Sequence, residues 1–219
     1  MNFGKCGYQK KNKKEENEKE ERTITISKLL KTVYADIEQF GMEDDSFNRG
    51  IMYPLYKKKD KTKIENYRPL TMLETDYKIL TKVLSQKLGV VAPDLIHENQ
   101  AGFVPGRSLY DHIKLAQLMP DYAESDFKDR LIVSLDQEKV YDKIDHDYLW
   151  QMMAKDNFPQ KFTQLVKTLY SNAKTSVMVN GVIPTAINIK RGTRQGDPMS
   201  CILYNLAIEP LACALRESK

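Results

Sequence analysis

The segment VSLDQEKVYDKIDHDYL, residues 133–149, gathers carboxylates directly after an apolar run. The run ends at Asp136, and three more aspartates follow at Asp142, Asp145 and Asp147. A carboxylate at the C-terminal end of a buried strand projects from a fixed backbone, and carboxylate oxygens are ligands that Mg²⁺ prefers. Aspartates in such a segment also cap and solvate helices. We therefore predict that Asp136 holds a metal ion, that Asp145 caps a helix, and that the other two face water.

Tyr141 follows Asp136 closely, where the chain is expected to turn back beside the end of the strand. A bulky ring at this position is suited to lie under the sugar of a bound nucleotide and to exclude a 2′-hydroxyl. An aromatic side chain there would also serve to pack the strand onto a helix. The segment alone leaves both roles open.

The segment RGTRQGDPMS, residues 191–200, has a composition that suits contact with a nucleotide. Gly196 allows close approach of the backbone, Arg194 brings positive charge, and Gln195 has an amide that can contact a base or a sugar. A helix is expected to follow, and the free N–H groups at its N-terminus favour anions. The alternative interpretation is a well-capped turn between a hairpin and a helix.

The elements that must position these residues follow from hydrophobic periodicity and from glycine and proline. In the second half we expect a buried strand at 130–136, helices at 145–156 and 159–172, a hairpin turning at Asn180–Gly181, and a final helix. Asp197 should cap that helix, with Pro198 as its first residue and Pro210 kinking or ending it.

The first half is expected to be more helical and more basic. Amphipathic periodicity predicts a helix from near Thr25 to Gly41, and Leu80, Val83, Leu84 and Leu88 should face inward from a second helix. The remaining expected elements are a strand at 51–56 in which Pro54 demands an edge or a bulge, a basic turn at 57–63, the second helix at 75–88 capped by Thr75, a loop at 99–108, and a helix from Ser108 to Met119 that ends before Pro120.

Composition limits the function classes. The 219 residues are 41% hydrophobic and 29% charged, which is enough for a core, and the net charge of +4 permits a nucleic-acid partner. Residues 1–24 are so charged that we expect a disordered tail or a solvated helix extension. Three cysteines without a CxxC pair predict a reduced, intracellular protein, and the sequence shows no apolar run long enough for a membrane span.

Four blocks of the sequence together resemble a known family. These blocks are YRPLTMLETDYKILTKVL, ENQAGFVPGRSLYDHI, SLDQEKVYDKIDHDYL and RGTRQGDPMSCILYNL. They resemble, in order and spacing, the reverse transcriptase of non-LTR (LINE-type) retrotransposons. The resemblance covers roughly residues 50–219.

The resemblance implies an α+β fold, that of a right-hand polymerase with fingers, a partial palm and no thumb. The implied domains are a charged tail at 1–24, fingers with an N-terminal helix at 25–129, and a partial palm at 130–219. Members of the family copy an RNA template into DNA from a DNA primer, using deoxynucleoside triphosphates and two Mg²⁺ ions. No membrane partner is expected.

The resemblance also implies roles for individual residues. Asp136 would be the first metal-bearing aspartate, with the backbone carbonyl of Gln137 as a further metal ligand. The residues implied at the nucleotide site are Tyr141 as the sugar gate, Gln195 and Gly196 along the incoming nucleotide, and Arg68 at the triphosphate. The residues implied in nucleic-acid binding are Lys57, Lys58, Lys59, Arg107 and Arg194, although the lysines would also suit a solvated surface and Arg107 would also suit support of the fold.

One departure from the family pattern bears on activity. Family members carry an aromatic-Ala-Asp-Asp tetrad shortly after the RQGDP helix, and the sequence through Lys219 does not contain it. Two-metal catalysis needs carboxylates on both sides of the ions, so we expect this chain to be a fragment that is inactive alone. The alternatives are a noncatalytic nucleic-acid-binding remnant and an RNA-directed RNA polymerase, and Tyr141 argues against the second.

Overall fold

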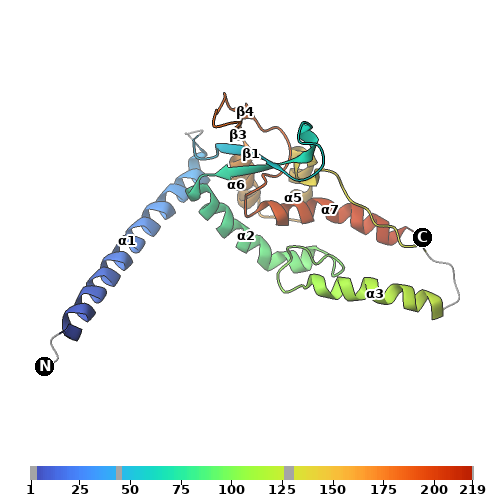
Figure 1. Cartoon of the computed structure of the whole chain (residues 1–219), viewed down its shortest axis with the longest axis horizontal. Helices are drawn as coiled ribbons and strands as arrows, with labels where there is room; N and C mark the ends of the chain where they lie inside the picture. Colours follow the sequence, from blue (N-terminus) through green and yellow to red (C-terminus); the bar gives the residue numbers. More distant parts are fainter. Residues whose placement is uncertain (1–3, 43–45, 126–130, 219) are drawn as a thin grey trace. The chain divides into compact units, whose positions relative to one another are not determined.

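The computed structural model describes the backbone of residues 4–42, 46–125 and 131–218 (Figure 1). By its internal contacts the chain divides into two compact units, Met1–Glu43 and Asp44–Lys219. The helices that the structure describes include none long and apolar enough to cross a bilayer.

The first unit consists of one long helix, α1, which spans Gly4–Phe40. It begins well before Thr25, so the charged segment has the conformation of the helix extension rather than that of a tail. Lys and Glu dominate this segment, and both have good helix propensity. Gly41 ends the helix as predicted, because its φ is +85° and its N–H donates to the carbonyl of Ile37 at 3.0 Å.

The second unit opens with an antiparallel hairpin of β1, Gly50–Tyr56, and β2, Tyr67–Leu73. The register places Pro54 opposite Pro69. Neither proline has an N–H to donate, so this pair occupies a non-hydrogen-bonded position of the ladder. At such positions the backbone groups of both strands point away from the partner strand.

The same register fixes where the backbone groups of Met52 and Thr71 point. These two residues form another non-hydrogen-bonded pair, two positions away from the prolines. The carbonyl of Met52 accepts a hydrogen bond from the N–H of Met178 at 2.8 Å. The N–H of Thr71 points to the outer edge of β2, where it donates to the carbonyl of Gln195 at 3.1 Å. A loop from far along the chain therefore covers the edge of the hairpin at Thr71.

Two more strands complete a mixed sheet in the order β2-β1-β3-β4. Strand β3, Lys174–Val177, pairs in parallel with residues 50–52 of β1, and β4, Ile187–Asn188, pairs antiparallel with β3. The sheet thus combines strands from the expected fingers with strands from the expected palm. The boundary at residue 130 stays a prediction.

The predicted turn of the second hairpin is confirmed. Asn180 and Gly181 have φ values of +51° and +79°, as a tight two-residue turn requires. On either side of them, Val179 and Val182 exchange two backbone hydrogen bonds of 3.1 and 3.0 Å.

Six α-helices and a short 3₁₀ turn are described in the second unit, and α2 packs against α7 while α5 packs against both α6 and α7. The bounds are η1 Ile64–Asn66, α2 Thr75–Leu95, α3 Leu109–Ser125, α4 Val140–Lys143, α5 His146–Lys155, α6 Gln160–Tyr170 and α7 Ser200–Glu217.

The core lies where these helices meet one another and the inner face of the sheet. The inward face predicted for α2 is confirmed at Leu80, Leu84 and Leu88, whereas Val83 is exposed. The other helices contribute large side chains that are fully buried, namely Leu149 and Met153 from α5, Val166 and Leu169 from α6, and Leu203 and Leu206 from α7.

The buried strand predicted at 130–136 is wrong for the residues described there. Residues 131–137 have no regular secondary structure, and the apolar side chain of Leu131 is 86% exposed. A strand is stable only when its backbone groups pair with a neighbour. The four described strands leave this segment without one, so its apolar pattern has no sheet to join.

Several predicted helix ends also differ from the structure. Glu74, not Thr75, is the N-cap residue of α2. Helix α3 continues through Pro120, and α7 continues through Pro210 to Glu217. Helix α7 also starts at Ser200 with Met199 as its N-cap residue, so the predicted cap Asp197 and Pro198 both lie before the helix.

Candidate functional site

The turn that follows Asp136 packs against the first half of α7. The hydroxyl of Tyr204 donates to Oε1 of Gln137 at 3.1 Å, and the rings of Tyr141 and Tyr204 lie 5.1 Å apart. The hydroxyl of Tyr141 lies 3.8 Å from Sγ of Cys201. Burial raises the pKa of Tyr141 to about 12, and the neighbouring thiol of Cys201 adds to this shift.

Backbone hydrogen bonds join the same turn to the loop before α7. The N–H of Thr193 donates to the carbonyl of Tyr141 at 2.6 Å, and the N–H of Gly192 donates to the carbonyl of Ile144 at 2.7 Å. A Cβ at Gly192 would lie only 2.7 Å from the carbonyl oxygen of Tyr141, and the φ of Gly192 is +84°. The close approach therefore requires glycine at this position.

The other end of this loop rests on β2. The carbonyl of Gln195 accepts from Thr71, and a Cβ at Gly196 would collide with the carbonyl oxygen of Thr71. Gly196 also has a φ of +108°. The side chain of Gln195 is half-buried. Three segments distant in sequence thus meet here: β2, the loop 191–196 and the turn after Asp136.

A cleft of about 310 Å³ opens beside the turn. Its walls include Gln137 and Val140 from the turn, Asp145 and Tyr148 around the start of α5, and Tyr204 from α7. Polar groups from the turn and a tyrosine from α7 therefore face the same open space.

A polar cluster lies buried under the loop. Asp197 accepts hydrogen bonds from the N–H of Met199 at 2.9 Å and from the hydroxyl of Tyr77 at 3.1 Å. Burial raises the pKa of the Asp197 carboxyl, against the opposing effect of the hydrogen bond from Met199. Burial likewise raises the pKa of Tyr77, and the nearby Asp197 adds to it. The guanidinium carbon of Arg194 lies 5.3 Å from the centre of the Tyr77 ring.

The candidate metal ligands lie on the exposed part of this arrangement. Asp136 is exposed and the amide oxygen of Gln137 is bonded to Tyr204. Among the residues that the structure describes, no three His, Cys, Asp or Glu side chains lie close enough together to hold a metal ion. Two-metal chemistry needs several carboxylates around the ions. The described residues therefore do not form such a centre by themselves.

The three other aspartates of the segment have different surroundings. Asp145 is confirmed as the cap of α5, because its Oδ1 accepts from the N–H of Tyr148 at 3.1 Å. Asp147 is exposed, as predicted. Asp142 is half-buried rather than facing water, and this burial raises the pKa of its carboxyl, against the effect of nearby Lys139.

The basic residues of the first hairpin lie at its surface. Arg68 is exposed on β2, three residues and therefore about 10 Å along the strand from Thr71. The turn beyond it exposes Lys57, Lys58 and Lys59. This part of the chain can therefore offer positive charge to a phosphate backbone.

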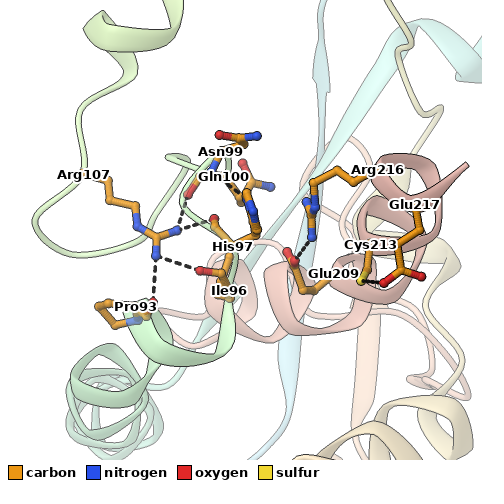
Figure 2. Close-up of polar contacts among 10 residues, drawn as sticks. All are labelled: Pro93, Ile96, His97, Asn99, Gln100, Arg107, Glu209, Cys213, Arg216 and Glu217. Carbon is orange, nitrogen blue, oxygen red and sulfur yellow. Dashed lines mark hydrogen bonds and ion pairs between the residues drawn. The ribbon is translucent and has the colours of Figure 1, made fainter. Parts of the chain in front are cut away.

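Arg107 is different, because its guanidinium is bonded to backbone carbonyls (Figure 2). Its Nη1 donates to the carbonyls of His97 and Gln100 at 2.6 and 2.8 Å, and its Nη2 donates to those of Pro93 and Ile96 at 2.8 and 2.7 Å. These carbonyls lie at the C-terminal end of α2 and in the loop after it. Such hydrogen bonds indicate that Arg107 supports the fold, which is the second of its two predicted roles.

Arg194 is also placed differently from the prediction. Its side chain is 3% exposed. A guanidinium that is buried in this way does not reach a phosphate at the surface, so direct contact with nucleic acid does not agree with the structure.

Comparison with known proteins identifies the family. The family model described as "Reverse transcriptase (RNA-dependent DNA polymerase)" matches residues 56–219. The chain belongs to the reverse transcriptase family. Its relatives indicate a reverse transcriptase domain of the non-LTR retrotransposon type.

Three relatives illustrate the extent of the likeness. The transposon TX1 uncharacterized 149 kDa protein of Xenopus laevis is 38% identical over 78% of this chain and 13% of that protein. Pol polyproteins of the R2 retrotransposable elements are 24% identical in Nasonia vitripennis and 25% identical in Drosophila melanogaster, over 69% and 67% of this chain. The chain spans only 15% and 14% of those two proteins.

Two features of this reverse transcriptase domain were not predicted from the sequence. One is the buried cluster around Tyr77, a residue of α2 that the periodicity did not single out. The other is Asn205 on α7, which is buried and donates through Nδ2 to the carbonyl of Gly102, tying the loop before α3 to α7. In both cases the partners lie more than 100 residues away, so no local pattern could have revealed them.

Proposed function

We propose that this chain is the nucleotide-binding part of an RNA-directed DNA polymerase from a non-LTR retrotransposon. In this proposal residues 25–129 belong to the fingers and residues 130–219 to the palm. Its partners are an RNA template, a DNA primer and deoxynucleoside triphosphates, and the remaining palm and the thumb would come from sequence outside these residues.

One observation supports this proposal above all others. The proposed sugar gate, Tyr141, and the proposed nucleotide loop, Gln195–Gly196, belong to segments that are joined by the hydrogen bond from Thr193 to the carbonyl of Tyr141. The loop in turn touches β2, the strand that carries Arg68. The segments of the gate and of the nucleotide loop are thus neighbours, and Arg68 lies about 10 Å further along β2.

Reverse transcriptases use divalent metal ions, and Mg²⁺ is our proposal for this one. Asp136 and the backbone carbonyl of Gln137 would contact it. Because the described residues contribute a single candidate carboxylate, we propose that this chain alone does not extend a primer. Losing even about 4 kcal/mol of transition-state stabilisation would slow transfer by roughly a thousandfold.

A primer-extension assay combined with filter binding tests the proposal. We expect the full chain to retain an RNA–DNA primer-template on the filter, with binding that weakens as salt rises because Lys57, Lys58 and Lys59 contact phosphates. Replacing all three lysines with alanine should lower the salt dependence, by roughly 0.7 to 0.9 in the log–log slope for each phosphate that the variant no longer neutralises. Binding that is independent of salt would contradict this assignment.

Nucleotide selectivity tests the gate separately. We expect the chain to bind dATP more tightly than ATP, and Tyr141→Ala to reduce this difference because the smaller side chain leaves room for the 2′-hydroxyl. Equal affinities in the unmodified chain would instead favour a polymerase that uses ribonucleotides.

A second candidate function is a noncatalytic nucleic-acid-binding remnant. The absence of a three-ligand metal cluster among the described residues favours it. Salt-dependent binding of primer-template without measurable affinity for dATP would support this alternative over a nucleotide-binding fragment.

A further inference from the structure

We infer that Arg194 is a positioning residue, whose side chain crosses beneath the sheet and holds the Gln195–Gly196 loop against β2. The functional consequence, namely tighter nucleotide binding, depends on the proposed role of that loop. The structural part rests only on interactions of described residues.

The path of the Arg194 side chain is defined at both ends. Its backbone carbonyl accepts from Oγ of Ser200 at 2.8 Å, which ties it to the start of α7. At the far end, Nη2 lies 3.4 Å from the carbonyl of Lys174 on β3, and the guanidinium lies over the ring of Tyr77. One residue therefore links α7, α2 and the third strand of the sheet.

Gly50 on β1 provides the space for this crossing. A Cβ on Gly50 would lie 2.9 Å from Nη2 of Arg194 and 3.1 Å from Oγ1 of Thr175 on β3. It would also lie 2.5 Å from Cγ2 of Thr71 on β2. The guanidinium thus lies directly against the inner face of β1, with side chains of both neighbouring strands beside it.

Hydrogen bonding by itself does not explain why an arginine occupies this place. Nε and Nη1 of Arg194 have no hydrogen-bond partner among the described residues, although the side chain is buried. A buried charge with unsatisfied donors is unfavourable, although burial raises the pKa of the neighbouring Asp197 carboxyl and the charge of Arg194 lowers it, which offsets part of this cost. An unsatisfied buried group of this kind calls for another explanation.

The neighbouring residues supply that explanation. Gln195 and Gly196 follow Arg194 directly, and both are held to Thr71, by a hydrogen bond and by a close backbone approach that only glycine permits. Because Arg194 is anchored under the sheet, the next two residues have little freedom to leave the edge of β2. Such support from a buried neighbour is what a precise binding site needs.

Arg194→Met in the full chain tests the inference. Methionine removes the charge and the interactions of the guanidinium but keeps an unbranched apolar stem. We expect some loss of thermal stability, because the Asp197 carboxyl loses a neighbouring cation. Beyond any change in the rest of the sheet, the amide hydrogen of Thr71, which donates to Gln195, should exchange about tenfold faster or more. The affinity for dTTP should fall about tenfold.

Arg191→Met is the matched control, because Arg191 is an exposed arginine three residues earlier and its loss changes the net charge equally. It should leave the exchange of Thr71 unchanged. The inference is overturned if Arg194→Met also leaves this exchange unchanged, or if exchange accelerates equally throughout the sheet, since Arg194 would then only fill space.

Failure of the proposed function has a different signature. If the unmodified chain does not bind dTTP, the nucleotide assignment fails, while the exchange of Thr71 still decides whether Arg194 positions the loop. Should Arg194→Met not fold, Arg194→Lys is judged by the same exchange measurement, because a lysine keeps the charge but loses the planar contact with Tyr77.

Discussion

Asp197 is a carboxyl that stabilises the turn before α7 and yet lies almost completely away from solvent. Its carboxyl accepts from Met199 and from Tyr77, but burial outweighs these bonds and raises the pKa above its ordinary value of 3.8. An acid with a raised pKa in the folded state favours folding most when it is protonated. The contribution is complete below the ordinary pKa and is lost as pH rises through the raised value.

Asp197→Asn should therefore become more stable relative to the unmodified chain as pH rises from about 4 to 8. The amide oxygen of asparagine still accepts from Met199, whereas the cost of burying an ionised group is removed. Thermal unfolding across this pH range measures the difference.

Asp147→Asn is the control, because Asp147 is exposed on the surface of α5. It should have a pH profile parallel to that of the unmodified chain. Parallel profiles for Asp197→Asn as well would show that Asp197 is accommodated without such a cost.

Among the elements, the C-terminal end of α2 depends on one side chain that lies outside it. Figure 2 shows Arg107 reaching back to the carbonyls of Pro93 and Ile96 and to the loop that follows. A positive charge at this end of a helix is also favoured by the helix dipole. The loop 96–107 therefore takes its shape from Arg107 and from Asn205 of α7.

Arg107→Met should lower the free energy of unfolding by about 2–4 kcal/mol, since it removes several charge-assisted hydrogen bonds. Urea denaturation measures this change. The salt dependence of RNA binding should stay the same, because the guanidinium of Arg107 is engaged by backbone carbonyls rather than offered to a phosphate.

Arg68→Met is expected to behave in the opposite way. Arg68 is exposed, so its loss should change stability by no more than about 0.5 kcal/mol but weaken the binding of dATP. If Arg107→Met weakened nucleic-acid binding with unchanged stability, the structural role assigned to it would be wrong.

The hairpin allows a second prediction at the scale of elements. Gly50→Ala places a methyl group against Thr71, Arg194 and Thr175, so we expect a loss of about 1–3 kcal/mol in the free energy of unfolding. Gly102→Ala is the matched control, because the nearest atom to its Cβ would be 3.8 Å away. Equal effects of the two substitutions would contradict the close packing at Gly50.

Local signals explain which elements were predictable from the sequence. The turn at Asn180–Gly181, the stop at Gly41 and the cap at Asp145 each depend on residues a few positions apart, and all three are confirmed. The helix end predicted before Pro120 was wrong, and α7 does not end at Pro210, because interactions along a helix can outweigh the missing N–H of one proline.

The site was predictable to a smaller extent. The RQGDP run and Tyr141 were recognised by their residue types, and the structure brings their segments together. The burial of Arg194 was missed because an arginine is normally found at the surface. The space left by the missing side chain of Gly50, more than 140 residues earlier in the chain, contributes to its burial.

For the molecule as a whole, apolar side chains of the described residues are exposed in two stretches of the chain. Leu131 and Leu135 are 86% and 78% exposed in a segment without regular structure, and none of the side chains of α3 is buried by the rest of the described chain. Exposed apolar segments with high β-propensity promote association. We therefore expect the isolated chain to be poorly soluble.

The double substitution Leu131→Glu and Leu135→Glu should reduce this association without changing the midpoint of thermal unfolding. Sedimentation velocity at increasing protein concentration measures the effect. Ile64→Glu is the control, because Ile64 is 77% exposed but lies alone in the turn of the first hairpin. A sharp, reversible thermal transition of the unmodified chain in dilute buffer would contradict the expectation of poor solubility.

The facing prolines of the first hairpin also decide how wide the sheet can become. At this position of the ladder the backbone N–H groups would point away from the partner strand, and proline has none. The row of outward N–H groups is therefore interrupted on the outer edge of both β1 and β2. The pairing of β1 with β3 stops at Met52, just before this position. The two prolines thus limit the end of the hairpin that carries Lys57, Lys58 and Lys59 to two strands. A third strand cannot form a continuous ladder of hydrogen bonds past this pair.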